Sequence, residues 1–158
     1  MPAIRCYRPA DLPLLQAMTA AAFDGVSIDQ GLEREFGIVA GHDWQWRKMR
    51  HIADDADRNA AGILVMEADD GKIVGFISTW CDREAGIGYI ANVVVDAEFR
   101  GLGHGRELLH AALRHFRELG LTHARIETLV QNERGRQLYE SVGFREIARQ
   151  IHFAAKLS

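Results

Sequence analysis

The feature that most constrains the fold is a buried strand that runs into a glycine-rich loop and then into a helix. Three valines at positions 93–95 end an apolar run, and glycines follow at positions 101, 103 and 105. An apolar stripe of period 3.6 then predicts a helix over residues 103–119, and Gly120 supplies its stop. A strand over 123–130 follows. A strand–helix–strand unit of this length places strands 88–96 and 123–130 parallel, through a right-handed crossover.

The remaining elements build a sheet around this unit. Strands over 62–68, 73–81 and 88–96 are joined by short turns, so they form an antiparallel meander. A strand at 4–7, a helix at 11–23 and one or two helices within 28–59 precede the meander, with residues 42–56 helical. A helix over 132–142 and an extended strand over 144–157 end the chain. We therefore predict an α/β fold with a mixed sheet, helices on both faces, and one domain over residues 1–158.

Composition narrows the class of protein. The chain has 158 residues, of which 47% are apolar and 26% charged, as is usual for a globular domain. A net charge of −3 gives no support for nucleic-acid binding. No apolar run reaches the ~18 residues that a membrane helix needs, and no secretory signal is visible. Cys6 and Cys81 fit no metal spacing and are expected to be reduced thiols, so we expect a cytoplasmic protein without a membrane partner.

The glycine loop has the properties of an anion-binding site. A helix N-terminus exposes unpaired N–H groups and the positive end of the helix dipole, and glycines let an anion approach the backbone. Arg100, His104 and Arg106 add charge or donors, so a diphosphate is the expected ligand. The nucleotide P-loop is excluded because no Lys-Ser or Lys-Thr pair is present, and the dinucleotide fingerprint fails because Arg106 stands where its third glycine belongs.

Two motifs carry a resemblance to a known family. The loop reads R-x-x-G-x-G over residues 100–105, and residues 132–144 read N-x-x-G-x-x-L-Y-x-x-x-G-F. Both resemble the GNAT superfamily of acyl-CoA-dependent N-acetyltransferases, and the element order agrees over nearly the whole chain. The departure is Gly135 where that family has Ala, which costs up to ~1 kcal/mol of helix propensity.

The resemblance implies a GNAT-like fold whose parallel strands splay apart, acetyl-CoA as co-substrate and no metal. It implies direct transfer of the acetyl group, in a ternary complex, to a primary amine of a small molecule or protein. Tyr139 would be the general acid that protonates the departing thiolate. The residues that the resemblance assigns to the cofactor are Val93, Val94, Val95, Arg100, Gly101, Leu102, Gly103, His104, Gly105, Arg106 and Asn132.

Each of the two downstream residues also has a structural interpretation. Asn132 is a good N-cap for the last helix, and capping alone would explain it. Tyr139 would then be a buried aromatic residue with a satisfied hydroxyl. The general base is unassigned, because residues 88–93 contain no carboxylate; Asp82, Glu84 and Glu127 are the nearby acids. The alternative function is a non-catalytic acyl-CoA-binding sensor, and a homodimer is an open alternative for the assembly.

The resemblance places the acceptor pocket in residues 23–59. Carboxylates there suit a cationic amine and tryptophans a flat or cationic one, but an amphipathic helix with solvated acids and packed tryptophans explains them equally well. The acids and tryptophans concerned are Asp24, Asp29, Glu33, Glu35, Trp44 and Trp46. The histidines fit no metal spacing and are expected on surfaces or helix faces; they include His42, His51, His110, His115 and His123.

Overall fold

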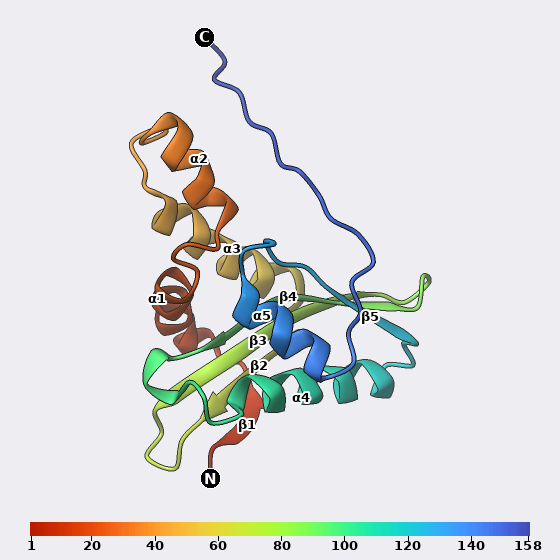
Figure 1. Ribbon diagram of the computed structural model, residues 1–158. Coiled ribbons are helices and arrows are strands. Elements are labelled where there is room, and N and C mark those ends of the chain that lie inside the picture. Colours follow the sequence, from red (N-terminus) through yellow and green to blue (C-terminus); the bar gives the residue numbers. More distant parts are fainter.

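The computed structural model describes all residues, 1–158, and contains a five-stranded sheet in the order β1-β2-β3-β4-β5 (Figure 1). The pairs β1–β2, β2–β3 and β3–β4 are antiparallel, and the pair β4–β5 is parallel. The strands are β1 (Ala3–Cys6), β2 (Ile63–Glu67), β3 (Ile73–Asp82), β4 (Ile87–Val95) and β5 (His123–Ile126). The predicted meander and parallel unit are confirmed.

Helices cover both faces of this sheet, as the sequence predicts (Figure 1). They are α1 (Leu12–Ala22), α2 (Ile28–Phe36), α3 (Trp44–Asn59), α4 (His104–Glu118) and α5 (Glu133–Ser141). Single 3-10 turns lie at Pro9–Asp11, Ala60–Gly62 and Ala97–Phe99. No helix has the length and the apolar character that crossing a membrane would require.

Two apolar cores, one on each face, hold the layers together. On β3, Val74 and Ile77 pack with Leu108 and other residues of α4. These two residues share a face although they are three positions apart, because Val74 is an extra residue in β3: Met66 opposes Gly75, and the next residue of β2 opposes Ile73. Ile73 and Phe76 of the same strand pack instead with residues of α1 and α3. The sheet is thus buried on both sides, and each face can present a different surface at its edge.

The parallel strands separate after a short paired stretch. β4 and β5 pair only from Ile87 opposite His123 to Ile90 opposite Ile126, whereas β4 continues to Val95. The predicted divergence is confirmed, and β5 is shorter than the strand predicted over 123–130 because residues beyond Ile126 have no neighbour to pair with. Ala91 is also an extra residue in β4, since Ser78 opposes Asn92 and the next residue of β3 opposes Ile90. Bulges of this kind often lie beside active sites.

The predicted last strand over 144–157 is wrong. These residues contain no strand, and Figure 1 shows them leading away from the body of the molecule. Some of their apolar side chains alternate along the chain, as in a strand, but no neighbouring strand is present to form hydrogen bonds with this segment. Phe153 is 90% exposed and Leu157 is 93% exposed.

We expect brief digestion with trypsin to remove this C-terminal segment first. Cleavage after Arg145 and Arg149 should be complete while the arginines of α4 remain uncut, because exposed extended chain is the preferred protease substrate. The shortened protein should melt within about 2 °C of the full chain, since the removed residues make no packing contacts. Mass spectrometry and thermal unfolding provide the two measurements. Slow cleavage at Arg149 would instead show that the segment is docked on a sheet edge.

Candidate functional site

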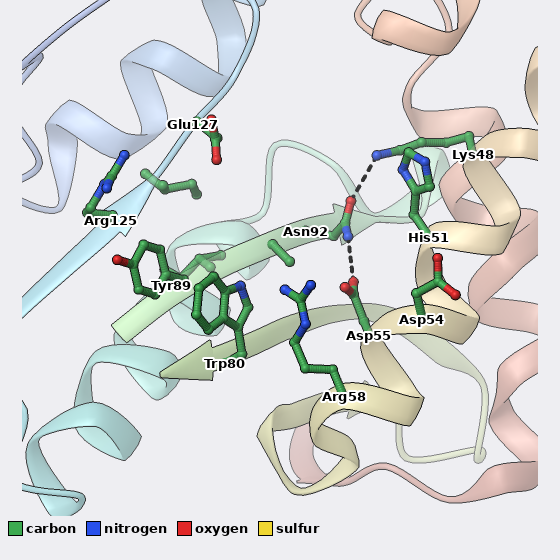
Figure 2. Close-up of a pocket in the computed structure, with 13 residues that line it drawn as sticks. Lys48, His51, Asp54, Asp55, Arg58, Trp80, Tyr89, Asn92, Arg125 and Glu127 are labelled. Atoms are coloured by element: carbon green, nitrogen blue, oxygen red, sulfur yellow. Dashed lines mark hydrogen bonds between the residues drawn. The ribbon is translucent and has the colours of Figure 1, made fainter. Parts of the chain in front are cut away.

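A cleft of about 380 Å³ opens where β4 and β5 separate, on the face of the sheet that carries α3 (Figure 2). Its floor includes Ala91, the bulged residue of β4, and Ile126, the last paired residue of β5. The lining residues are Lys48, His51, Asp54, Asp55 and Arg58 of α3, Trp80 of β3, Tyr89, Ile90, Ala91 and Asn92 of β4, Arg125 and Ile126 of β5, and Glu127.

One face of α3 forms a wall of this cleft. Positions 48, 51, 55 and 58 follow one another at three- or four-residue steps, which puts them on a single helix face. The helix begins where the Asp43 carboxylate accepts a hydrogen bond of 2.8 Å from the Trp46 N–H. Ile52 is fully buried against α1 and the sheet, and this contact fixes the rotation of the helix.

A buried polar network joins this wall to the sheet. The Oδ2 atom of Asp55 accepts hydrogen bonds of 2.8 Å from the Ser78 hydroxyl and from the Asn92 amide. The amide oxygen of Asn92 in turn accepts one of 3.1 Å from the Lys48 ammonium, as Figure 2 shows. The Oδ1 atom of Asp55 has no partner. A carboxylate therefore reaches β4 from α3, although β4 itself contains none.

Lys48 is the buried cation of the site. Its ammonium lies 3.9 Å from the ring centre of Phe23. Burial lowers the pKa of Lys48 below its ordinary value, and the negative charges of Asp29 and Asp55 oppose that shift. The hydrogen bond to Asn92 and the aromatic contact hold the ammonium in place despite the cost of removing it from water.

This shift predicts a pH dependence of stability. The folded chain releases the Lys48 proton at a lower pH than the unfolded chain, in which the pKa of this lysine is near 10.5. Between the two pKa values the unfolded chain binds more protons than the folded chain. The contribution of Lys48 to the free energy of unfolding should therefore increase as the pH rises. Urea unfolding from pH 7 to pH 10 should show a less positive slope for Lys48→Met than for the wild type. Lys156→Met, in the exposed C-terminal segment, should leave the slope unchanged; equal slopes for all three would contradict the shift.

A stacked aromatic pair forms the other part of the lining. Trp80 and Tyr89 oppose each other across β3 and β4, with ring centres 4.0 Å apart and planes 6° from parallel. The Arg58 guanidinium lies 4.9 Å from the Trp80 ring, and that of Arg125 lies 5.4 Å from the Tyr89 ring. Neither guanidinium has an ion-pair or hydrogen-bond partner within the chain, so both retain donors for a ligand.

The glycine loop follows β4 and leads to α4 on the opposite face of the sheet. Gly101 and Gly103 adopt φ values of 79° and 87°, the left-handed region in which a side chain is strained, and a Cβ on either would meet open space. The Nδ1 atom of His104, at the first position of α4, is buried and has no hydrogen-bond partner. The nearest acid to this nitrogen is the Glu107 carboxylate, at 3.8 Å. Backbone N–H groups at the start of a helix are suited to binding an anion.

The other loop residues play more varied parts. The Arg100 side chain donates a 3.2 Å hydrogen bond to the Val95 carbonyl, while Leu102 and Arg106 are exposed. Gly105 faces α5, because a Cβ there would lie 3.0 Å from Leu138. Its lack of a side chain therefore serves the packing of α4 on α5, in addition to any role at the ligand.

The valines at positions 93–95 and Asn132 contribute to the packing of the sheet and to the start of α5. Val94 is buried with α1 and α3, whereas Val93 and Val95 pack on the α4 side. The side-chain oxygen Oδ1 of Asn132 accepts a 3.1 Å hydrogen bond from the Gly135 N–H, so the residue caps α5. A Cβ on Gly135 would lie 2.4 Å from the Asn132 amide nitrogen. The glycine that departs from the family motif thus makes room for the cap.

Tyr139 does not line the cleft. Its ring lies partly buried on the α4 side of the sheet, with the Phe144 ring edge-on at 6.4 Å. Burial raises the pKa of Tyr139 to about 12. The cleft residues of α3 and this tyrosine are therefore on opposite faces, and the gap between β4 and β5 is the opening between those faces.

Three of the candidate acceptor-site residues of segment 23–59 are held in packing and hydrogen-bonding roles. Trp44 is buried and Trp46 stacks on His42 at 3.4 Å, so both tryptophans have packing roles. Glu33 accepts a hydrogen bond from the Trp44 N–H, which ties α2 to α3. Of the three acids near the strand, only Glu127 reaches the cleft. The side chains of Asp82 and Glu84 remain on the exposed β3–β4 turn.

Comparisons with known proteins agree with this geometry. Residues 26–144 match the Acetyltransferase (GNAT) family. A mycothiol acetyltransferase of Propionibacterium freudenreichii is 32% identical over 150 residues, which are 94% of this chain and 44% of that protein. The chain thus spans less than half the length of this curated relative.

Solved structures show the same fold. A protein of Pyrococcus horikoshii is 25% identical with a TM-score of 0.71, and the match covers 95% of this chain and 92% of that one. The PaiA N-acetyltransferase of Thermoplasma acidophilum, solved with coenzyme A, is 19% identical with a TM-score of 0.72 over 92% of this chain and 90% of that one. The match to the family over three quarters of the sequence is the decisive finding: this chain belongs to the GNAT family of acetyltransferases.

Proposed function

We propose that this chain transfers an acetyl group from acetyl-CoA to a primary amine of a small molecule or protein, by direct attack in a ternary complex. The observation that carries the proposal is the gap between β4 and β5, with a charged cleft on one face and the glycine loop beside α5 on the other. The similarity to mycothiol acetyltransferases supports acetyl transfer. The acceptor of those longer proteins is not carried over to this chain.

The glycine loop and His104 would hold the diphosphate. Residues 91–95 of β4, which pair with β3 but not with β5, would align the pantetheine arm. Acetyl-CoA supplies a thioester whose carbonyl carbon accepts the amine. The amine nitrogen forms the new C–N bond, the C–S bond breaks, and the amine loses a proton. The carboxylates of the cleft lining that can accept that proton, directly or through water, are those of Asp54, Asp55 and Glu127.

Tyr139 is proposed to act on the departing sulfur from the other face. With a pKa of about 12, its hydroxyl keeps its proton at any physiological pH. A coenzyme A thiol has an ordinary pKa of ~8.5, so complete proton transfer from Tyr139 to the thiolate is unfavourable. The hydroxyl is therefore better suited to stabilise the developing thiolate by a hydrogen bond, while water supplies the final proton.

The test is amine-dependent release of free thiol from acetyl-CoA by the purified chain. A broad panel of primary amines and peptides should contain acceptors that raise the release above the rate without amine, and mass spectrometry should show the acetylated product. Calorimetry on the same preparation establishes that acetyl-CoA binds. Tight binding with no amine-dependent release across the panel would favour the acyl-CoA-binding sensor instead.

A further inference from the structure

The cleft contains equal numbers of opposite charges. Its cations are Lys48, Arg58 and Arg125, and its carboxylates are Asp54, Asp55 and Glu127. Three of each sign leave the lining neutral if His51 is uncharged. A neutral lining composed of charged groups suits a ligand that carries both signs, because a polycation would leave the guanidiniums unpaired and a polyanion would leave the carboxylates unpaired.

Two neighbouring groups on α3 provide the opposite charges at short range. Asp55 and Arg58 are three residues apart and therefore lie on one helix face. The Asp55 carboxylate is oriented by Ser78 and Asn92 and keeps one oxygen free. The Arg58 guanidinium rests on Trp80, and Figure 2 shows it between that ring and Asp55.

The state of Arg58 indicates what it binds. It has three nearby acids on its own helix, Asp54, Asp55 and Asp57, yet forms an ion pair with none of them within 4.0 Å. Stacking on an indole ring leaves the N–H groups at the edge of the guanidinium free, and their planar fork matches a carboxylate or phosphate. The arginine is thus held in place by an aromatic ring while its donors stay unused.

We propose that the acceptor is a zwitterionic amine, a small molecule that carries an anionic group close to the amine it presents for acetylation. Asp55 binds the ammonium form of the amine, and Arg58 binds the anionic group. An amino acid with its free carboxylate has this chemistry, as does an aminophosphonate. The inference rests on the proposed acetyl transfer and specifies its substrate class.

The test compares matched acceptors that differ only in the anion. Each of the L-amino acids with a primary amine is assayed beside its carboxamide, and 2-aminoethylphosphonate is assayed beside its uncharged phosphonate diester. The value of kcat/KM is measured for both members of each pair. For the pairs that react best, the wild type should favour the anionic member by about 10-fold or more, since a charge-assisted hydrogen bond is lost with the anion.

Variants of Arg58 separate the bound anion from other causes. The two amines of a pair differ in their own pKa, which affects their reactivity with any variant. The quantity compared between variants is therefore the change in one ratio: kcat/KM for the anionic amine divided by kcat/KM for its neutral partner. Arg58→Gln should bring this ratio close to the value set by the intrinsic reactivities of the two amines. Arg58→Lys keeps the positive charge and should restore part of the wild-type preference for the anionic amine. Arg117→Gln, on the exposed side of α4, is the matched control and should leave the ratio unchanged.

The outcomes distinguish this inference from the proposed function. If neutral amines are acetylated as well as the anionic members, or if Arg58→Gln leaves the ratio unchanged, the substrate class is wrong while acetyl transfer stands. If acetyl-CoA binds and no amine in either group is acetylated, the proposed function itself fails, and the inference fails with it. A preference for the anionic amines that disappears in Arg58→Gln and partly returns in Arg58→Lys supports the inference.

Discussion

Replacing Gly103 by valine is expected to weaken acetyl-CoA binding by about tenfold. A valine leaves the left-handed backbone in the free protein, and returning to it when the ligand binds costs roughly 1–2 kcal/mol, where each 1.4 kcal/mol is a factor of ten. At φ 87° the wild-type loop presents its backbone to the ligand without a side chain in the way. A valine would either strain that conformation or change it, and both outcomes disturb the N–H groups at the start of α4.

A matched control exists at the other end of the same helix. Gly120 has a φ of 80° and open space around its absent Cβ, so Gly120→Val carries a similar backbone strain. Both variants should lose similar thermal stability, but only Gly103→Val should lose affinity in titration calorimetry. Equal affinities for the two variants would remove the glycine loop from the binding site. Gly105→Val is a poorer test because it would push Leu138 and disturb α5.

Tyr139→Phe is expected to lower kcat by ~10²–10³-fold with little change in acetyl-CoA affinity, the usual cost of removing one hydrogen-bond donor to the charge that develops in a transition state. The change removes only the hydroxyl, whose hydrogen bond to sulfur forms mainly in the transition state and so affects kcat most. With the pKa of Tyr139 at about 12, the pH–rate profile of the wild type should show no break from this group below pH 10.

Tyr7 provides the control for this experiment. Burial raises the pKa of Tyr7 as it does that of Tyr139, but Tyr7 packs with α1 and α3 on the other face of the sheet. Tyr7→Phe should therefore leave kcat unchanged. If Tyr139→Phe turns over at the wild-type rate while chemistry is shown to be rate-limiting, Tyr139 is a packing residue and water alone serves the leaving sulfur.

The elements could be predicted from the sequence where local pattern determines them. The valines at 93–95, the glycine loop and the stripe of α4 specify the parallel unit, and Asn132 marks the start of α5. The last strand could not be predicted from alternation alone, because Ile151 and Phe153 have the strand pattern without a partner strand. The pattern describes one face of a strand but contains no information about its neighbour.

The cleft was harder to foresee because it depends on contacts between distant segments. Asp55 reaches Asn92 across 37 positions of sequence, and only the packing of α3 on the sheet brings them together. A carboxylate that a helix supplies to β4 cannot be predicted from the residues of β4 alone. The pairing of Trp80 with Tyr89 was available from the meander, since the turn between the two strands sets their register.

The concentration of cleft side chains on a single face of α3 affects how the proposed acceptor specificity could change. Lys48, His51, Asp55 and Arg58 all come from one helix, whereas the glycine loop and α5 belong to a separate part of the chain. Substitutions in the two groups share no contact, so their effects on free energy should add. If the proposed function holds, a library confined to the cleft face of α3 would change which amine is accepted while the residues proposed to bind the acyl donor stay unchanged. Substitutions along this one helix would then be an easy evolutionary path to altered specificity.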